Sequence, residues 1–330
     1  MRAIVIDRFG GPDELTPREL PVPSPARGEV LVKVEVAGVN FIDVYMRSGA
    51  YGKSDTYKTP LPMTIGMEAG GTVAALGDGV QGLEVGERVA YCLARGSYAE
   101  YALVPAWRAV KVPEGVPLAH ATALMLQGLT AHYLSHSVFA LKPGDSCLVH
   151  AAAGGVGQLL TQLAKLCGAT VLGTVGDADK MRIALARGCD HAILYRETDF
   201  REEVMRLTGG RGVDVVYDSV GKDTIDRSIR CLRRRGLCVM YGASSGQVAG
   251  IAPLALAEAG SVFFTRPHLA DYIADADEVG SRSAALFRHY ADGKLKVALH
   301  GTLDLEAAAE AHRILEARGT RGKLLLRVSS

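Results

Sequence analysis

A glycine-rich turn is the part of this sequence best suited to bind a phosphate group. The apolar residues 147–150 precede Ala151-Ala-Ala-Gly-Gly-Val-Gly157, which carries the spacing Ala152-x-Gly154-x-x-Gly157 and leads into an expected helix. Small residues there allow a tight turn, close approach of the backbone to a pyrophosphate, and packing of the helix against the strand. The helix N-terminus adds free N–H groups and a partial positive charge. The segment therefore predicts a dinucleotide-binding unit.

The tip of the next expected strand favours NADPH over NADH. Residues 170–176 contain no Asp or Glu, whereas an NAD site usually places a carboxylate there to bind the ribose hydroxyls. Without that carboxylate a 2′-phosphate is not repelled, and Lys180 can donate a charge-assisted hydrogen bond to it. Asp177 and Asp179 act against this interpretation, and the alternative that Lys180 is an ordinary solvated helix residue stays open.

Hydrophobic patterning divides the chain into a β-rich first third and a region of alternating strands and helices. Glycine and proline punctuate the first third, which predicts a compact barrel with strands at residues 29–36, 70–76, 88–92 and 97–104. A buried helix at 118–139 is followed by expected strands at 146–150, 170–175, 192–194, 213–217, 237–241 and 262–265, and by helices that include 156–167 and 180–187. This alternation implies a mainly parallel sheet covered by helices. Helices at 284–290 and 305–317 precede a last strand at 323–328, which we expect to return to the N-terminal domain.

Composition excludes several classes of partner. Of 330 residues, 37 are Lys or Arg and 36 are Asp or Glu, so the net charge makes no case for nucleic acid or an anionic membrane. No apolar run reaches the roughly 18 residues of a membrane span, and Asp7 and Arg8 come too early for a signal peptide. The six cysteines form no C-x-x-C pair, as expected for free thiols in the cytoplasm.

Six motifs spread over the chain resemble those of one family. They are Gly38-Val-Asn-Phe-Ile-Asp-Val-Tyr45-x-Arg47-Ser-Gly-x-Tyr51, His150-Ala-Ala-Ala-Gly-Gly-Val-Gly157, Gly173-Thr-Val-Gly176, Val216-Tyr-Asp-Ser-Val-Gly221, Gly242-x-Ser-Ser-Gly246 and Thr265-Arg-Pro267. With them the sequence resembles the NADPH:quinone oxidoreductases, the zinc-free, zeta-crystallin-like branch of the medium-chain dehydrogenase/reductase superfamily.

The resemblance implies an α/β fold with two domains. A GroES-like β-barrel catalytic domain would begin in residues 1–122 and resume in 269–330. A Rossmann-type NADPH-binding domain, with a doubly wound parallel sheet, would occupy residues 123–268. The family also implies a homodimer associated through the Rossmann domains.

The resemblance further implies which residues contact NADPH. Those on the nicotinamide side would be Asn40, Phe41, Ile42, Asp43 and Tyr45. The pyrophosphate would lie against Ala153, Gly154, Gly155, Val156 and Gly157, and the 2′-phosphate among Lys180, Tyr195 and Arg318. The other contacts would come from Gln127, Thr130, Gly173, Thr174, Gly176, Ser219, Tyr241, Gly242, Ser244, Thr265, Arg266 and Pro267. Relatives often carry Lys where this chain has Gln127, so a charge is lost there.

The superfamily also includes zinc alcohol dehydrogenases, whose ligands are missing from this sequence. Gly66-Met67-Glu68 stands where they carry Gly-His-Glu, and Asn40 lies in the region of their first Cys ligand. His132 and His136 are spaced to share one helix face, but no third ligand accompanies them. We therefore expect no metal.

A quinone-like acceptor suits a site without a metal, because its carbonyls accept hydride from the cofactor readily. The protein would need to stack the acceptor on the nicotinamide and donate hydrogen bonds to the developing oxyanion. Asn40 is expected to position the nicotinamide, and Tyr45 and Tyr51 are the candidate donors. The alternative for both tyrosines is a cleft wall that provides only shape. We expect His150 to be buried and hydrogen-bonded.

Two other functions stay open. An NADPH-dependent enone or 2-alkenal reductase would share the cofactor residues and differ only in its acceptor pocket. An NADPH-binding structural or RNA-binding protein is the second. The only basic cluster in this sequence is residues 230–235. We interpret it as the solvated end of a Rossmann helix and not as an RNA-binding surface, because no aromatic platform accompanies it.

Overall fold

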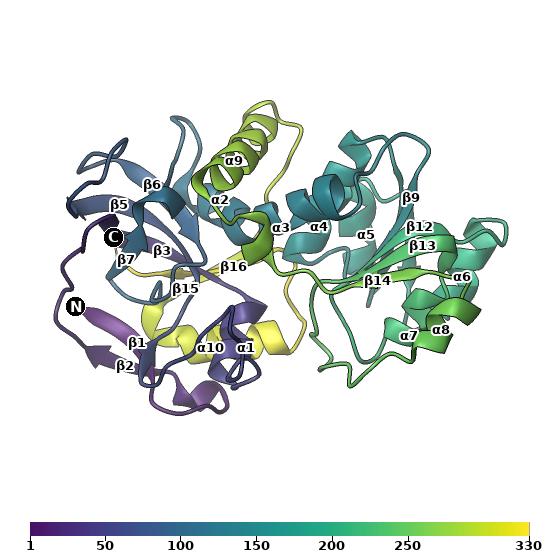
Figure 1. Cartoon of the computed structure of the whole chain (residues 1–330), viewed down its shortest axis with the longest axis horizontal. Coiled ribbons are helices and arrows are strands. Elements are labelled where there is room, and N and C mark those ends of the chain that lie inside the picture. The colour runs from purple at the N-terminus through teal and green to yellow at the C-terminus, as the bar shows by residue number, and fades with distance from the viewer. Residues whose placement is uncertain (330) are drawn as a thin grey trace. The chain divides into compact units, whose positions relative to one another are not determined.

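The computed structural model describes residues 1–329 and divides the chain into two compact units (Figure 1). Unit 1 comprises Met1–Leu129 together with the residues from Ile273 onward, and unit 2 comprises Thr130–Tyr272. The domain boundaries expected after residues 122 and 268 lie a few residues before these divisions and stay predictions. No helix within residues 1–329 is long and apolar enough to cross a membrane.

Two sheets form the framework of unit 1. The larger has the strand order β15-β16-β3-β5-β6-β8, with β7 also paired to β3, and the smaller has the order β2-β1-β4. Their strands are β1 (Arg2–Ile6), β2 (Thr16–Glu19), β3 (Glu29–Val39), β4 (Met63–Thr64), β5 (Glu68–Leu76), β6 (Arg88–Cys92), β7 (Tyr101–Pro105), β8 (Val110–Lys111), β15 (Leu299–Asp304) and β16 (Lys323–Arg327). In β3 the valines are buried and Lys33 is exposed, which is the alternation that predicted this strand.

The last strand returns to the first half of the chain, as predicted. β16 runs antiparallel to the end of β3, with Leu324 opposite Val39 and Arg327 opposite Val36. Figure 1 shows the N- and C-termini in the same unit, with α10 (Ala308–Glu316) beside β15 and β16. The C-terminal residues thereby lie next to the end of β3, where the predicted nicotinamide-side motif begins.

The other helices of unit 1 are α1 (Phe41–Arg47), α2 (Leu118–Ala123) and α9 (Ala276–Ala291), with short 3-10 turns at Pro12–Glu14, Ala106–Arg108 and Leu305–Ala307. α9 starts earlier than the expected residue 284, because the Asp275 carboxylate caps it by accepting the Glu278 N–H at 2.9 Å. Its polar first turns carry too little apolar periodicity to indicate a helix from sequence.

A helix expected at residues 118–139 is confirmed, but it is not uniform. α2 passes into a π-helical turn at Leu124–Gly128, then α3 (Leu129–Tyr133), then a second π turn at Leu134–Val138. The wider turns are built on longer hydrogen bonds, such as that from Phe139 N–H to the Leu134 carbonyl at 3.3 Å. π turns within α-helices are frequently found at functional sites, and the first one holds Gln127.

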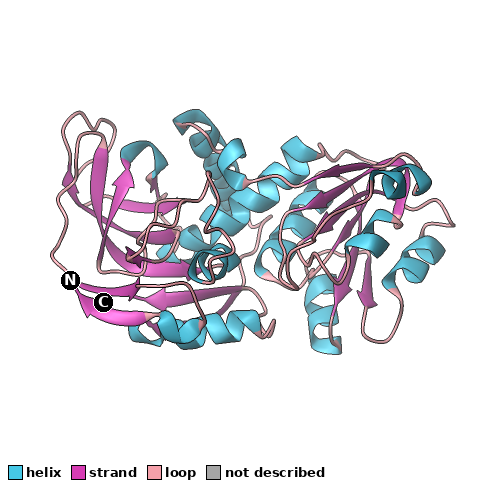
Figure 2. Ribbon diagram, turned by 60° about the horizontal axis from the view of Figure 1, so that its bottom comes forward, coloured by secondary structure: helices cyan, strands magenta, loops and turns pink. Residues whose placement is uncertain are grey.

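Unit 2 is a six-stranded parallel sheet with the order β11-β10-β9-β12-β13-β14. The strands are β9 (Ser146–Val149), β10 (Thr170–Val175), β11 (His191–Leu194), β12 (Val213–Asp218), β13 (Leu232–Met240) and β14 (Phe263–Thr265). The helices are α4 (Gly155–Leu166), α5 (Ala178–Ala186), α6 (Phe200–Leu207), α7 (Ile225–Ile229) and α8 (Pro253–Glu258). Figure 2 shows helices on both sides of the sheet. The predicted doubly wound fold is confirmed, and its strand order reverses between β9 and β12, where such sheets bind ligands.

Two sequence expectations are wrong in detail. The strand expected at 97–104 begins only at Tyr101, because the N–H groups of Ser97 and Tyr98 bond to the carbonyls of Gly66 and Ile65 outside any ladder. Of the basic residues 230–235, only Arg230 lies at a helix end, where it is the C-cap of α7. α7 stops at Ile229, and the arginines from position 233 onward belong to β13.

Candidate functional site

The glycine turn lies between the carboxyl end of β9 and the N-terminus of α4, as predicted. Gly154 caps the helix, and its N–H donates to the Ala151 carbonyl at 2.8 Å. A Cβ on Gly157 would lie 2.3 Å from that carbonyl oxygen and 2.9 Å from Ala152 Cα, so only glycine fits there. The first-turn N–H groups of a helix have no intrahelical acceptor, and α4 is a long helix whose start is open to an anion.

The tip of β10 is framed by a hydroxyl and a guanidinium group. A Cβ on Gly176 would lie 3.2 Å from Tyr195 Oη and 3.6 Å from Arg196 Nε. Tyr195 was selected from the sequence and is 43% exposed, so its hydroxyl is accessible to a ligand. Arg196 was not selected. Its signal was a basic residue two positions after the end of β11, the strand beside β10, and the order of strands in a sheet cannot be read from one sequence.

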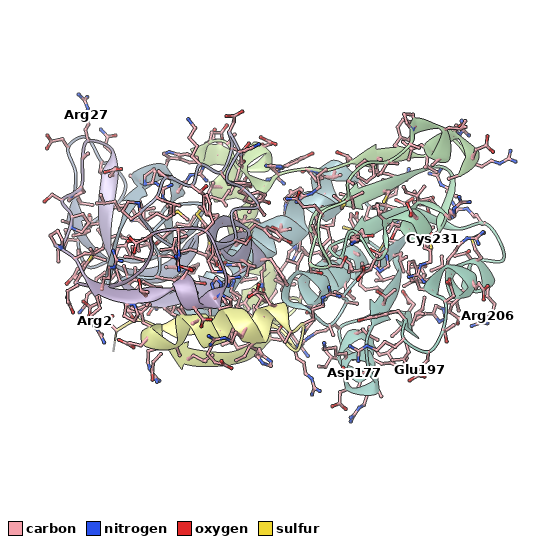
Figure 3. All side chains as sticks on the ribbon, turned by 90° about the horizontal axis from the view of Figure 1, so that it is seen from below. Arg2, Arg27, Asp177, Glu197, Arg206 and Cys231 are labelled. Atoms are coloured by element: carbon pink, nitrogen blue, oxygen red, sulfur yellow. The ribbon has the colours of Figure 1, made fainter. Side chains whose placement is uncertain are left out.

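The acidic residues that argued against NADPH are engaged in local contacts. The Asp177 carboxylate caps α5 and accepts the Lys180 N–H at 2.8 Å. Asp179 forms an ion pair with Arg182. Figure 3 shows Asp177 and Glu197, which lie near this region in sequence, along the same edge of unit 2. Asp177 and Asp179 therefore have structural partners within or next to α5.

A buried network joins the carboxyl ends of the central strands. His150 is 1% exposed, and its ring nitrogens lie 2.9 Å from Thr174 Oγ1 and 2.9 Å from Ser228 Oγ. Ser228 donates to Asp218 Oδ2 at 2.7 Å. Burial lowers the pKa of His150, so it is neutral near pH 7. The predicted buried, hydrogen-bonded role of His150 is confirmed.

The loops after β12 and β13 meet at this same edge. The Tyr241 N–H donates to the Asp218 carbonyl at 2.9 Å, and the Ser244 N–H donates to the Ser219 carbonyl at 3.1 Å. A Cβ on Gly242 would lie 2.7 Å from the Ser219 carbonyl oxygen. The predicted residues Ser219, Tyr241, Gly242 and Ser244 are thus brought together. Thr265 ends the neighbouring strand β14 opposite Val239, followed by Arg266 and Pro267.

Unit 1 gathers a second set of predicted residues around a buried ion pair. Lys323 and Glu68 are 1% and 0% exposed, and the ammonium contacts the carboxylate directly. Lys323 Nζ also donates to Asn40 Oδ1 at 2.7 Å, and Asn40 Nδ2 donates to Glu68 Oε2 at 2.9 Å. The other oxygen of Glu68 accepts the Leu126 N–H at 2.6 Å. These contacts fix the Asn40 side chain and tie it to the π turn that carries Gln127.

Neither Lys323 nor its partners could be identified from sequence as one cluster, because 255 positions separate Lys323 from Glu68. Glu68 belongs to the stretch compared above with the zinc-ligand motif, Asn40 contacts both members of the pair, and Gly38 leaves room for it. A Cβ on Gly38 would lie 2.8 Å from Lys323 Cε and still closer to Glu68. Within residues 1–329, no three His, Cys, Asp or Glu side chains are arranged to hold a metal ion.

A chain of hydrogen bonds leads from Arg47 to the start of α1. Arg47 Nη1 lies 3.0 Å from His312 Nδ1, and His312 Nε2 lies 3.2 Å from the Tyr98 hydroxyl. Arginine only donates, so Nδ1 accepts and Nε2 carries the hydrogen. Tyr98 then donates to Asp43 Oδ2 at 3.2 Å, and the Asn40 N–H donates to the same oxygen at 2.8 Å. Every donor in the chain points toward Asp43.

Asp43 was predicted to line the nicotinamide side, but its side chain is fully buried in this network. Desolvation raises its pKa to about 7, although the Asn40 N–H and the Lys323 charge oppose the rise. Burial, with the Arg47 charge, lowers the pKa of His312 to about 3. Asp43 is therefore suited to hold the N-terminus of α1 rather than to touch a ligand with its carboxylate.

Aromatic side chains follow one another along α1 and the segment after it. The ring centroids of Phe41 and Tyr45 are 6.0 Å apart, those of Tyr45 and Tyr51 are 5.4 Å apart, and those of Tyr51 and Tyr57 are 5.2 Å apart. The two predicted donor tyrosines are thus neighbours in one aromatic row. Tyr57 was not selected from the sequence, although its spacing from Tyr51 was visible.

The remaining predicted residues are scattered around these clusters. Gln127 is half-buried in the first π turn, and Thr130 is buried in α3. Arg318 follows α10 in a left-handed backbone conformation, with φ of 56°. His132 and His136 stack with ring centroids 4.2 Å apart, which is a packing contact and brings no third ligand among the described residues.

Comparison with known proteins gives two family matches. A family described as alcohol dehydrogenase GroES-like domain matches residues 26–114, and one described as zinc-binding dehydrogenase matches residues 155–276. The first lies within unit 1. The second begins within the glycine turn and includes strands β10 to β14 of the parallel sheet of unit 2.

Full-length relatives are similar over nearly the whole chain. A 2-haloacrylate reductase of a Burkholderia species is 42% identical over 328 residues, covering 98% of each chain. Quinone oxidoreductase 1 of Escherichia coli strain K12 is 42% identical over 326 residues, again covering 98% of each chain. A solved Escherichia coli quinone oxidoreductase complexed with NADPH has a TM-score of 0.95 at 41% identity, covering 99% of this chain and 100% of that one. A mycobacterial protein complexed with NADPH also gives 0.95, at 43% identity and the same coverage.

Replacing Lys323 with Met should destabilise the protein by about 3–5 kcal/mol, because it leaves the Glu68 charge buried and unpaired. Urea unfolding measures the loss. The double variant Lys323→Met/Glu68→Leu, which removes both charges, should recover much of it, and Arg27→Met on the surface should have little effect. A double variant as unstable as the single one would contradict the assignment of the cost to an unpaired charge.

Replacing Asp43 with Asn should change how stability depends on pH. Burial raises the Asp43 pKa from 3.8 to about 7, so between these values the folded chain keeps a proton that the unfolded chain releases. The contribution of Asp43 to the free energy of unfolding therefore falls as pH rises through this window, by at most about 1.4 kcal/mol per pH unit.

Urea unfolding across the window measures the difference between the Asp43→Asn variant and the parent. The variant should gain stability relative to the parent as pH rises. His312, whose low pKa gives the opposite slope, is present in both proteins and cancels in the difference. A difference that stays constant with pH would show that Asp43 does not titrate there.

Proposed function

We propose, since the chain belongs to the quinone oxidoreductase family of the medium-chain dehydrogenase/reductase superfamily, that it transfers hydride from NADPH to a quinone-like acceptor. The observation that carries this proposal is the glycine turn at the start of α4, where Gly157 leaves no room for a Cβ, together with the acid-free tip of β10. The NADPH complexes of the two similar structures support the choice of cofactor.

NADPH, when bound, supplies the hydride. The residues of unit 2 fit its phosphate groups. In this proposal the pyrophosphate lies against Ala153, Gly154, Gly155, Val156 and Gly157, whose small side chains admit it to the helix N-terminus. Gly173 and Thr174 support this turn, since a Cβ on Gly173 would lie 2.7 Å from that of Ala152.

The 2′-phosphate is proposed to bind to Lys180, Tyr195 and Arg318. Arg196 would contribute a further positive charge. The guanidinium of Arg196 lies beside Gly176, where an NAD-specific chain would carry its carboxylate. Ser219, Tyr241, Gly242, Ser244 and Thr265 to Pro267 are proposed to complete the cofactor contacts, because their loops converge at the carboxyl edge of the sheet.

The nicotinamide end is proposed to contact Asn40, Phe41, Ile42 and Tyr45, and Gln127 and Thr130 are proposed as further cofactor contacts. Asn40 can position a ligand reproducibly because Lys323 and Glu68 already fix its amide. Asp43 acts beneath it by holding the Asn40 backbone. We propose that the reaction is zinc-independent, since the amide of Asn40 and the thioether of Met67 stand where zinc relatives carry ligands, and Lys323 supplies the cation beside Glu68.

The acceptor is proposed to stack along the row formed by Phe41, Tyr45 and Tyr51. A tyrosine hydroxyl would donate a hydrogen bond to the oxyanion that develops as hydride arrives. Tyr51 is packed edge-on against Tyr45 and stacked on Tyr57, so its ring is held in place and its hydroxyl direction is restricted.

A second candidate function is reduction of an activated alkene. The similarity to a 2-haloacrylate reductase, equal in identity to that with the quinone oxidoreductase, supports it. Steady-state kinetics with NADPH against 1,2-quinones, 1,4-quinones, 2-alkenals and 2-haloacrylate separates the two. Higher kcat/KM for the quinones supports the first proposal, and the reverse order supports the second.

We also propose a homodimer associated through unit 2 and a cytoplasmic location. β14 is an edge strand whose Phe263 is 62% exposed, and an exposed apolar strand edge suits pairing with a second copy. The six cysteines are all free thiols, as in a reducing compartment.

Replacing Lys180 or Arg196 with Ala should weaken the binding of NADPH but not that of NADH. A charge-assisted hydrogen bond contributes about 1.5–3 kcal/mol, so KM for NADPH should rise roughly tenfold or more while KM for NADH stays unchanged. Arg206→Ala, on α6, is the charge-matched control. Equal effects on both cofactors would contradict a role in reading the 2′-phosphate.

Replacing Tyr51 with Phe should lower kcat for quinones about tenfold. This is the rate factor expected from the loss of one hydrogen bond to the charge that develops in the transition state. KM for NADPH should not change. Tyr57→Phe is the matched control, because it removes a hydroxyl from the same row. Unchanged turnover in Tyr51→Phe would leave this tyrosine a wall residue.

A further inference from the structure

Strand β13 contains a bulge made largely of arginine. Val213 and Val215 of β12 pair with Leu232 and Leu237 of β13. β12 therefore advances by two positions while β13 advances by five, and the residues between the pairs leave the regular ladder. Those residues are Arg233, Arg234, Arg235 and Gly236. Bulges redirect side chains and often lie beside functional sites.

The backbone around the bulge is strained and closely packed. Arg235 has a φ of 58°, a left-handed conformation that costs a residue with a side chain about 1–3 kcal/mol. Its N–H donates to the Gly260 carbonyl at 2.9 Å. On the other side, a Cβ on Gly212 would lie 2.8 Å from Arg233 N. The position of the arginines is thus imposed by the fold and is not that of a loose surface loop.

A buried carboxylate orients two of the guanidinium groups. Asp214 is 3% exposed and accepts from Arg211 Nη2 at 2.7 Å and from Arg233 Nε. Burial alone would raise the Asp214 pKa, but hydrogen bonds from Arg211, Arg233 and Ser146 hold it well below its usual range. Asp214 therefore stays ionised, while Arg211 and Arg233 keep further N–H groups for other acceptors.

These arginines line a hollow. It has a volume of about 690 Å³, and its lining residues are Gly210, Arg211, Arg233, Arg234 and Arg235. Four of the five lining residues are arginines, and none is acidic. Asp214 contacts two of these arginines, Arg211 and Arg233, and Asp145 is the other acid that acts on Arg211. The excess of positive charge predicts an anionic ligand.

The hollow is a different place from the proposed cofactor site of the same unit. It lies at the amino ends of β12 and β13, whereas the glycine turn follows the carboxyl end of β9. All these strands are parallel, and each of their residues rises about 3.3 Å. A strand length therefore separates the two positions. Figure 3 agrees with this, because Cys231, at the amino end of β13, lies apart from Asp177, which follows the carboxyl end of β10.

We propose that this arginine pocket binds a compact polyanion with several phosphate groups, such as a short linear polyphosphate. Guanidinium groups bind phosphate oxygens in pairs, and four of them around one hollow suit clustered charge. The lining contains no aromatic side chain on which a base could stack. That favours a free polyphosphate over the phosphodiester backbone of a nucleic acid.

Isothermal titration calorimetry of the full chain with sodium tripolyphosphate tests the proposal, at constant ionic strength. We expect saturable binding near one equivalent per chain, much weaker binding of orthophosphate, and no competition from saturating NADPH. Absence of saturable binding would overturn the proposal. Binding abolished by NADPH would assign the anion to the cofactor site and would also overturn it.

The variant Arg235→Gly separates binding from folding. Glycine adopts a φ near 58° without strain, so the melting temperature should not fall, while the affinity for tripolyphosphate should drop at least tenfold. Arg27→Gly in unit 1 removes an equal charge and is the control. Equal weakening in both variants would show only nonspecific charge attraction and overturn the proposal.

A single-stranded oligoribonucleotide of matched phosphate concentration distinguishes the two sources of phosphate. We expect it to bind less tightly than tripolyphosphate. Tighter binding of the oligonucleotide that depends on Arg235 would overturn the proposed free polyanion in favour of a nucleic-acid surface.

Discussion

The buried ion pair between Lys323 and Glu68 is the interaction on which the candidate active site depends. Both charges are removed from water, so each requires the other, and Asn40 and the Leu126 N–H supply further hydrogen bonds. Lys323 opens β16, Glu68 opens β5, and Asn40 joins β3 to α1. The pair therefore couples docking of the C-terminal strand to the geometry of the nicotinamide-side motif. Asp43, through Tyr98 and His312, adds a second buried support for the same helix start.

Unit 2 builds its glycine turn and the carboxyl edge of its sheet by different means. Glycines allow backbone segments to approach so closely that Gly157, Gly173 and Gly242 leave no space for side chains. At the carboxyl edge of the sheet, His150 is hydrogen-bonded to Ser228, which donates to the Asp218 carboxyl group. This edge suits the negative charge of a dinucleotide because the first N–H groups of α4 have no intrahelical acceptor.

Local patterns were sufficient to predict most strands and helices, because alternation and glycine turns act within a few residues. The glycine turn and the absence of acidic residues at the tip of β10 are likewise visible in short stretches of sequence. Arg196, Tyr98, His312 and Lys323 could not be found from sequence, since their roles arise from strand order and from contacts between distant segments. The arginines after position 230 were assigned to a helix end, because a bulge in a strand leaves no periodic signal.

The central claim is direct hydride transfer from NADPH to a quinone in a site organised without a metal. Stopped-flow oxidation of NADPH by a 1,4-quinone, with deuterium at the transferred position of the nicotinamide and chelator present, tests it most directly. The account predicts a primary isotope effect on single-turnover oxidation and a rate that the chelator does not change. No isotope effect together with a rate abolished by the chelator would contradict it.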